Sequence, residues 1–150
     1  MYRVIIQQAA IDALAPKPAT LRKWAKKVLQ EKVKTAELTI RLVTVAEMQK
    51  LNEQYRYKKG PTNVLSFPLS LPEAVQLAIP ILGDVVLCSE IINEEAKIQE
   101  KTPESHWAHM VVHGLCHLLG YDHEAEKDAL KMQAVEIDLL YLLGFGNPYE

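Results

Sequence analysis

Residues 113–123 read HGLCHLLGYDH. His113 and His117 are four residues apart, a spacing that places two side chains on the same face of a helix. Gly120 follows three residues later, where helices commonly end in a left-handed residue. The chain can reverse at this glycine and bring His123 back toward the two helical imidazoles. The stretch therefore predicts a helix, a turn and one cluster of three histidines.

Three neutral histidines with a vacant coordination position are typical of a catalytic zinc site rather than a structural one. We therefore predict one Zn²⁺ ion bound by His113, His117 and His123. Imidazole also binds Ni, Cu and Fe, so the ligand type favours zinc without excluding these metals. Zinc lowers the pKa of a bound water to about 7 and polarises phosphoryl or carbonyl oxygens. The cluster thus indicates a hydrolytic or transesterifying enzyme.

The same spacing occurs in the metzincin peptidase pattern H-E-x-x-H-x-x-G-x-x-H, with one difference. Gly114 stands where those peptidases have their general-base glutamate. Glycine inside a helix costs about 1 kcal/mol relative to alanine. Either close helix packing or room for a bulky substrate would explain it. A metallopeptidase is the weaker alternative, because its usual base is missing.

Other polar residues near the cluster have two possible roles each. His109 lies one helical turn before His113. It either lines the site, supports a ligand from behind, or has a structural or surface role, and the role of His106 is equally open. Asp122 either accepts a hydrogen bond from a ligand imidazole or shapes the turn. The two cysteines, Cys88 and Cys116, are too few for a disulfide framework and are expected to be buried thiols.

Strand patterns dominate the first half of the chain and helix patterns the second. Alternating or buried apolar residues predict four strands, over 2–7, 38–42, 64–67 and 83–87. Capping residues predict helices that follow Thr20, Thr44, Ser89 and Thr102, with a last helix over about 124–143. The sequence therefore predicts an α+β fold, with a sheet of about four strands, in a single domain over residues 1–150.

Two of these helices have an apolar stripe. In the first, the stripe consists of Leu21, Trp24, Ala25, Val28 and Leu29, and its basic side chains lie off the stripe. In the second, Thr44 and Glu47 form a capping box, and the stripe is Met48, Leu51 and Tyr55. We expect both stripes to pack inward, which would place Tyr55 in the core.

Charge is distributed unevenly. Net charge is −2, but residues 1–60 hold 13 Lys and Arg against 5 Asp and Glu, whereas residues 61–150 hold 4 against 14. Such asymmetry indicates either a basic face that meets phosphates or ordinary solvated charge. The N-terminus lacks a secretory signal, and no apolar run reaches the roughly 18 residues that span a bilayer. We therefore expect a soluble, cytoplasmic protein with no membrane partner.

Three further segments support a family resemblance. Residues 51–56 read LNEQYR, residues 61–68 read PTNVLSFP and residues 82–85 read LGDV. Together with residues 113–123, they resemble the YbeY family of bacterial rRNA-processing proteins, whose signature is H-G-x-L-H-L-x-G-Y-D-H. Cys116 replaces the leucine that is more usual in that family. The resemblance covers the chain from about residue 51 to 123.

This resemblance implies a mixed sheet surrounded by helices, with the metal site in a cleft. It also implies a metal-dependent endoribonuclease that cleaves single-stranded RNA, matures the 3′ end of 16S rRNA and takes part in ribosome quality control. Its partners would be rRNA and the small ribosomal subunit, with no DNA. The arginine of the Tyr-Arg motif is a functional residue of the family, so Arg56 and His113 are the predicted catalytic residues.

A catalytic Arg56 agrees with the chemistry of RNA cleavage. A guanidinium stays charged and can bind two phosphate oxygens, so it can stabilise the negative charge of the transition state. Lys58 and Lys59 would either bind the RNA backbone or be solvated. Tyr57 is open to base stacking. Asp84, at a strand start, has either a structural or a site role.

Two questions stay open. The nucleophile is either a water activated by the metal or the RNA 2′-OH, and the sequence offers no clear general base. From a different class of function, the chain could be a ribosome-assembly binding module with a structural zinc. The vacant coordination position of a three-histidine site favours the enzyme.

Overall fold

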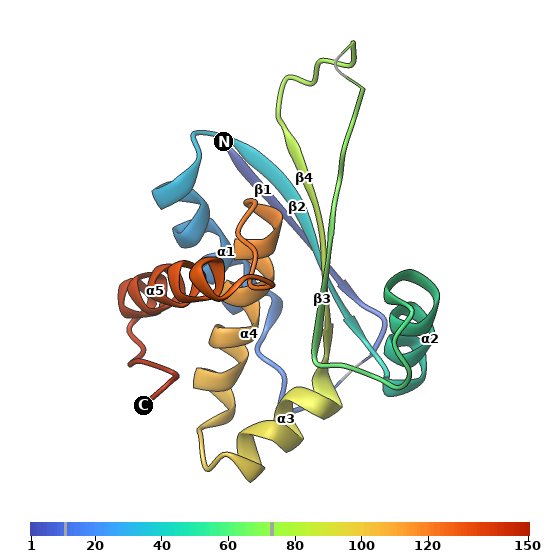
Figure 1. The fold of residues 1–150 in the computed structure, drawn as a ribbon, viewed down its shortest axis with the longest axis vertical. Coiled ribbons are helices and arrows are strands. Elements are labelled where there is room, and N and C mark those ends of the chain that lie inside the picture. The colour runs from blue at the N-terminus through green and yellow to red at the C-terminus, as the bar shows by residue number, and fades with distance from the viewer. Residues whose placement is uncertain (11, 73) are drawn as a thin grey trace.

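The computed structural model describes residues 1–10, 12–72 and 74–150. Its sheet has four strands, in the order β1 (Tyr2–Gln8), β2 (Ala36–Val43), β4 (Ile81–Cys88) and β3 (Val64–Pro68). Strands β1, β2 and β4 are parallel, whereas β3 pairs antiparallel with β4. The prediction of an α+β fold with a small mixed sheet is therefore confirmed (Figure 1).

The described residues also form five helices. They are α1 (Pro18–Lys32), α2 (Val45–Arg56), α3 (Ser89–Ile98), α4 (Pro103–Leu118) and α5 (Glu126–Leu143). Helices α1, α4 and α5 lie on one side of the sheet, and α2 lies on the other (Figure 1). The sheet is thus covered by helices mainly on one face, and the histidine stretch lies on the covered side.

The core follows the alternation of the strands. In β2, the even-numbered residues are fully buried and belong to the larger apolar cluster, together with the apolar face of α1 and the apolar side chains of α4. Burying a leucine or isoleucine side chain fully is worth about 1.5–3 kcal/mol. The opposite face carries a smaller cluster around Met48 and Val86, under α2. The inward stripe predicted for α1 is confirmed.

Helix α4 packs very closely on the sheet at Gly114. A Cβ atom at this position would lie 2.6 Å from Cγ1 of Val85 in β4. The backbone oxygen of Gly114 also accepts a hydrogen bond of 2.8 Å from Oγ of Ser66 in β3. Close packing against the sheet, rather than room for a substrate, therefore accounts for this glycine.

Three local predictions need correction. Thr20 was predicted as an N-cap, but α1 begins at Pro18 with Lys17 as its N-cap, so Thr20 lies inside the first turn. Proline fits the first helical position well, which explains the earlier start. Ser89 is likewise the first residue of α3, and Cys88 is its N-cap. Tyr55 is 55% exposed and packs edge-on against Phe67 on the open part of the sheet, so it is not a core residue.

Other helix ends agree with the predicted signals. The hydroxyls of Thr44 and Thr102 accept hydrogen bonds from the backbone N–H groups of Glu47 and Ser105, as N-caps do. Gly144 ends α5 in the left-handed conformation. None of the helices in the described parts of the chain combines the length and the apolar character needed to cross a bilayer.

Candidate metal centre

The three histidines of residues 113–123 converge on one point. His113 and His117 project from successive turns of α4, and His123 comes from the segment between α4 and α5. One ring nitrogen of each residue lies within 4.8 Å of those of the other two. The ring centroids are 4.7–5.5 Å apart. The structure thus brings together the three side chains that the spacing predicts, with the donor set that zinc favours.

Gly120 and Asp122 form the turn that returns His123 to α4. Gly120 has φ 98°, which an L-residue with a side chain rarely adopts. The N–H of Tyr121 donates to the oxygen of Cys116, which closes the end of the helix. The carboxylate of Asp122 accepts hydrogen bonds from the N–H groups of His123 and Glu124. Asp122 therefore shapes the turn through backbone hydrogen bonds.

The electrostatics of the cluster favour a neutral imidazole at His117. Burial, together with the neighbouring His113 and His123, lowers the pKa of His117 from 6.5 to about 4. A metal ion binds the neutral form of histidine through an unprotonated ring nitrogen. His117 is therefore in the form that binds a metal at neutral pH.

A buried carboxylate lies behind the cluster. Glu136 in α5 is 1% exposed, and its Oε2 lies 2.9 Å from Nδ1 of His113. Tyr149 and His109 also donate hydrogen bonds to this carboxylate, through Oη–H and Nε2–H. Burial raises the pKa of Glu136, but these hydrogen bonds outweigh it and lower the pKa to about 2. Metal-binding histidines commonly donate their second N–H to such a carboxylate.

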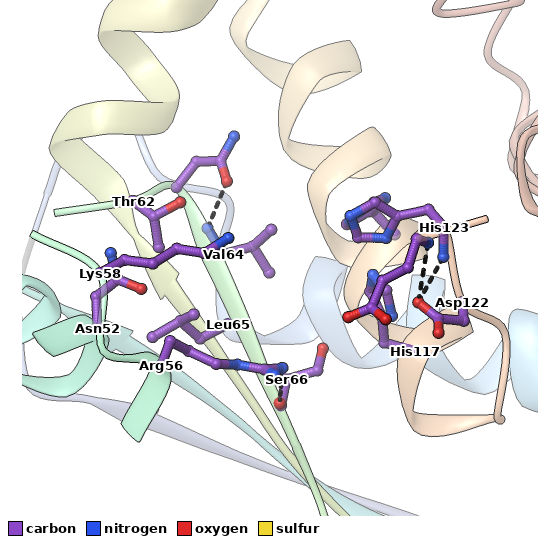
Figure 2. Close-up of a pocket in the computed structure, with 13 residues that line it drawn as sticks. Asn52, Arg56, Lys58, Thr62, Val64, Leu65, Ser66, His117, Asp122 and His123 are labelled. Atoms are coloured by element: carbon purple, nitrogen blue, oxygen red, sulfur yellow. Dashed lines mark hydrogen bonds between the residues drawn. The ribbon is translucent and has the colours of Figure 1, made fainter. Parts of the chain in front are cut away.

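The cluster opens into a cavity of about 590 Å³. His117 and His123 lie on one wall, and Arg56 and Lys58 lie on the other (Figure 2). His113, which clusters with the other two histidines, also lines the cavity. Pockets of 300–1,000 Å³ are typical of small-ligand sites. Most of the remaining lining residues are polar, namely Asn52, Thr62, Asn63, Ser66, Asp122 and Glu124. The apolar ones are Val64 and Leu65. This space suits a polar, charged substrate.

Arg56, the last residue of α2, reaches across the cavity. Its Nη2 donates a hydrogen bond of 3.2 Å to the backbone oxygen of Ser66 (Figure 2). Lys58 lines the cavity, whereas Lys59 and Tyr57 are not among its described lining residues. Tyr57 adopts a left-handed φ of 57° and is 89% exposed. The end of α2 therefore contributes Arg56 to the site, and the basic loop that follows it (residues 57–63) contributes Lys58.

Sequence reasoning missed the roles of Asn52 and Glu136 in this site and left the role of His109 open. Asn52 is buried, and its side chain donates to the oxygen of Gly60, which holds the basic loop closed. Glu136 has no motif around it, and it reaches His113 only through tertiary packing. His109 is buried and donates to Glu136, so its role lies behind the metal centre. Only the helical spacing of His109 to His113 gave a signal for this role.

Two other candidate residues, His106 and Asp84, lie outside the cluster. His106 is buried, and its Nε2 lies 2.9 Å from Glu95, which also accepts hydrogen bonds from Asn63 at the cavity edge. Asp84 lies on the other face of the sheet, in a hollow with Tyr55 and Phe67. His106 thus has a structural role, and Asp84 is not part of the metal centre.

Cys116 lies within α4, between the two helical histidines, but its thiol is buried. Burial, with a smaller contribution from the charge of Glu136, raises the pKa of Cys116 to about 12. Only the thiolate form of cysteine is a strong metal ligand. Cys88 and Cys116 are both buried and free, as predicted. Replacement of the more usual leucine by Cys116 is therefore a change within the core.

Known proteins resemble this chain over nearly its whole length. Residues 6–144 match a family model described as "Endoribonuclease YbeY". A protein of Nitrosococcus oceani named "Endoribonuclease YbeY" is 44% identical over 147 residues, which cover 98% of this chain and 96% of that protein. A protein of the same name from Pseudomonas entomophila is 48% identical over 142 residues, which cover 95% of this chain and 90% of that protein.

A solved structure has the same fold. The solution structure of TM1509 from Thermotoga maritima superposes with a TM-score of 0.59. The superposition covers 100% of this chain and 99% of the TM1509 chain, and the two sequences are 24% identical. This similarity supports the arrangement of the sheet and helices.

Proposed function

Because the chain belongs to the YbeY family of endoribonucleases, we propose that its histidine cluster and Arg56 together cleave single-stranded RNA at a phosphodiester bond. The observation that carries this proposal is the shared cavity. Three converging imidazoles lie on one wall and a guanidinium on the other. The substrate would be the 3′ end of 16S rRNA, on or near the small ribosomal subunit, and the place of action the cytoplasm.

His113, His117 and His123 would bind one Zn²⁺ ion. Their nitrogens lie close enough together to share an ion, and among the described residues no fourth side chain joins the cluster. Catalytic zinc sites have three protein ligands, whereas structural sites have four, so this set favours an enzyme over a binding module with structural zinc. When bound, zinc would polarise a phosphoryl oxygen and lower the pKa of a coordinated water.

Arg56 would bind the scissile phosphate from the opposite wall. It is exposed to the cavity and has donors to spare beyond its hydrogen bond to Ser66. A guanidinium aimed at a phosphate stabilises the charge that builds up as the diester is cleaved. Lys58, on the same wall, would bind a neighbouring phosphate. His113 would hold the metal facing the phosphate and thus take part in catalysis.

A metallopeptidase receives no support from the site. The position of the peptidase glutamate is occupied by Gly114, and a side chain there would meet Val85 of the sheet instead of the cavity. A general base at this position is therefore excluded by packing as well as by residue type.

The proposal is tested by measuring zinc content and cleavage of a single-stranded RNA together. His113→Ala is expected to lose zinc and activity. Arg56→Ala is expected to retain zinc but to lose about 10²–10³-fold in kcat. Arg3→Ala, an exposed arginine on β1, is the control and should cleave as the wild type does. Full activity of a zinc-free His113→Ala protein would contradict the proposal.

The ends of the RNA products identify the nucleophile. A 2′,3′-cyclic phosphate would show attack by the neighbouring 2′-OH, whereas its absence from early products would show attack by water. Either result is compatible with the roles of the three histidines and Arg56.

A further inference from the structure

Glu136 is a carboxylate with almost no access to water. It is 1% exposed and lies on α5, 23 residues after His113. An isolated buried carboxylate is strongly disfavoured unless it is paired and hydrogen-bonded. Within the described residues, every partner of this carboxylate belongs to one network: His113, His109 and Tyr149. A residue this costly to bury is expected to have a specific role.

The two oxygens of Glu136 have separate partners. Oε2 lies 2.9 Å from Nδ1 of His113. Oε1 accepts from the hydroxyl of Tyr149 and lies 3.4 Å from Nε2 of His109. Since both ends of the carboxylate are held, its plane cannot rotate freely, and Oε2 stays directed at His113.

This arrangement fixes the protonation of the His113 ring. A carboxylate only accepts hydrogen bonds, so Nδ1 of His113 must carry the proton. In a neutral imidazole the other nitrogen, Nε2, is then unprotonated and able to bind a metal. Glu136 therefore selects one tautomer and one ring orientation for this histidine.

We propose that Glu136 is a positioning residue of the metal centre, which holds His113 with Nε2 directed at the ion, and that Tyr149 keeps Glu136 in place. The inference rests on the proposed zinc site and extends it to the C-terminal segment. That segment is tied to the body of the protein, because Nζ of Lys101 donates a hydrogen bond of 2.7 Å to the oxygen of Pro148. Glu136 does not contact the cavity, so its effect on the reaction passes through His113.

The first test uses the wild-type protein without metal. Long-range ¹H–¹⁵N NMR of the histidine rings distinguishes the two neutral tautomers. We expect the Nδ1-protonated form for His113. An Nε2-protonated His113 in the folded wild type would overturn the proposal, and this result does not depend on any variant folding.

The second test measures zinc affinity by competition with a chromophoric chelator. Loss of such a partner typically weakens metal binding about 10–100-fold, so we expect this change for Glu136→Gln. Tyr149→Phe should weaken zinc binding by a smaller factor, because His113 keeps its carboxylate. Asp138→Asn is the matched control: it makes the same acid-to-amide change at an exposed position of α5 and should bind zinc as the wild type does.

A purely structural role gives a different result. Glu136→Gln would then lower the urea midpoint of the metal-free protein, but the folded fraction would bind zinc with unchanged affinity. That outcome overturns the inference. Failure of the wild type itself to bind zinc would instead overturn the proposed metal centre, so the two failures are distinguishable.

Discussion

Arg56 donates a hydrogen bond of 3.2 Å to the backbone oxygen of Ser66, while Oγ of Ser66 donates one of 2.8 Å to the oxygen of Gly114. Ser66 thus connects the arginine on one wall of the cavity to the helix that carries two of the histidines. Because hydrogen bonds are directional, these two contacts orient the guanidinium relative to the metal centre before RNA binds.

Arg56→Lys separates the charge of this side chain from its shape. Lysine keeps the positive charge but lacks the planar set of donors that can contact Ser66 and a phosphate together. We expect RNA affinity within about threefold of the wild type and kcat lowered at least about tenfold, since a directed transition-state contact is lost. Binding by fluorescence anisotropy and single-turnover cleavage measure the two effects, and an unchanged kcat would contradict a directed role.

Lys58 and Lys59 form a matched pair for RNA binding. Only Lys58 is among the residues that line the cavity, although both are exposed. Lys58→Ala is expected to reduce the slope of log K against log salt by about 1, as the loss of one phosphate contact does. Lys59→Ala should leave the slope unchanged. Equal effects of the two substitutions would show that the basic loop acts only through its total charge.

Gly114→Ala tests the close packing of α4 on the sheet. The new Cβ would lie 2.6 Å from Val85, and overpacking of a core costs about 1–3 kcal/mol. Alanine has a higher helix propensity than glycine, which stabilises the helix by about 1 kcal/mol. We therefore expect the free energy of unfolding, measured with urea, to fall by about 1 kcal/mol. Gly114→Ala should cost less in a Val85→Ala background, and a more stable single variant would contradict the packing described here.

Acid should destabilise the metal-free protein through His117. Its pKa is about 4 in the folded state against 6.5 for a free histidine, so the unfolded state binds more protons between these values. The contribution of His117 to stability is therefore complete above pH 6.5 and is lost as the pH falls toward 4. Urea midpoints at several pH values should fall less steeply for His117→Gln than for the wild type, and parallel slopes would refute this assignment.

Zinc should stabilise the folded protein and the turn after α4. At a free concentration of about 1,000 times Kd, a ligand that binds only the folded state adds about 4 kcal/mol. His123 is exposed and belongs to a turn that the ion would tie to α4. Calorimetry should show a Tm that rises with zinc concentration, and His123→Ala should remove most of this rise. Glu126→Ala, at an exposed position that is not among the described cavity-lining residues, is the control. An equal loss there would argue against a ligand role for His123.

The histidine cluster could be predicted from the sequence because its geometry is local. His113 and His117 are related by helical spacing, and Gly120 marks the end of the helix. Glu136 could not be predicted, since its contact with His113 depends on how α5 packs on α4. No pattern around Glu136 distinguishes it from a solvent-exposed glutamate.

Tyr55 and Thr20 show where local patterns mislead. Helical spacing placed Tyr55 with Met48 in the core, but α2 ends one residue later, and this end of the helix lies over an open part of the sheet. Thr20 has the side chain of a good N-cap, yet Pro18 starts the helix two residues earlier. In both cases the residue type was compatible with the predicted role. The role was not taken up because of where the residue lies relative to its neighbours in the fold.

Helix α4 supplies much of the larger apolar cluster and also two of the three imidazoles. Its register on the sheet is fixed by the contact of Gly114 with Val85, so small displacements of the helix move both histidines at once. Temperature-sensitive alleles are therefore expected among buried residues that touch α4, far from any RNA. Such proteins would lose metal and activity at a temperature where most of the chain is still native.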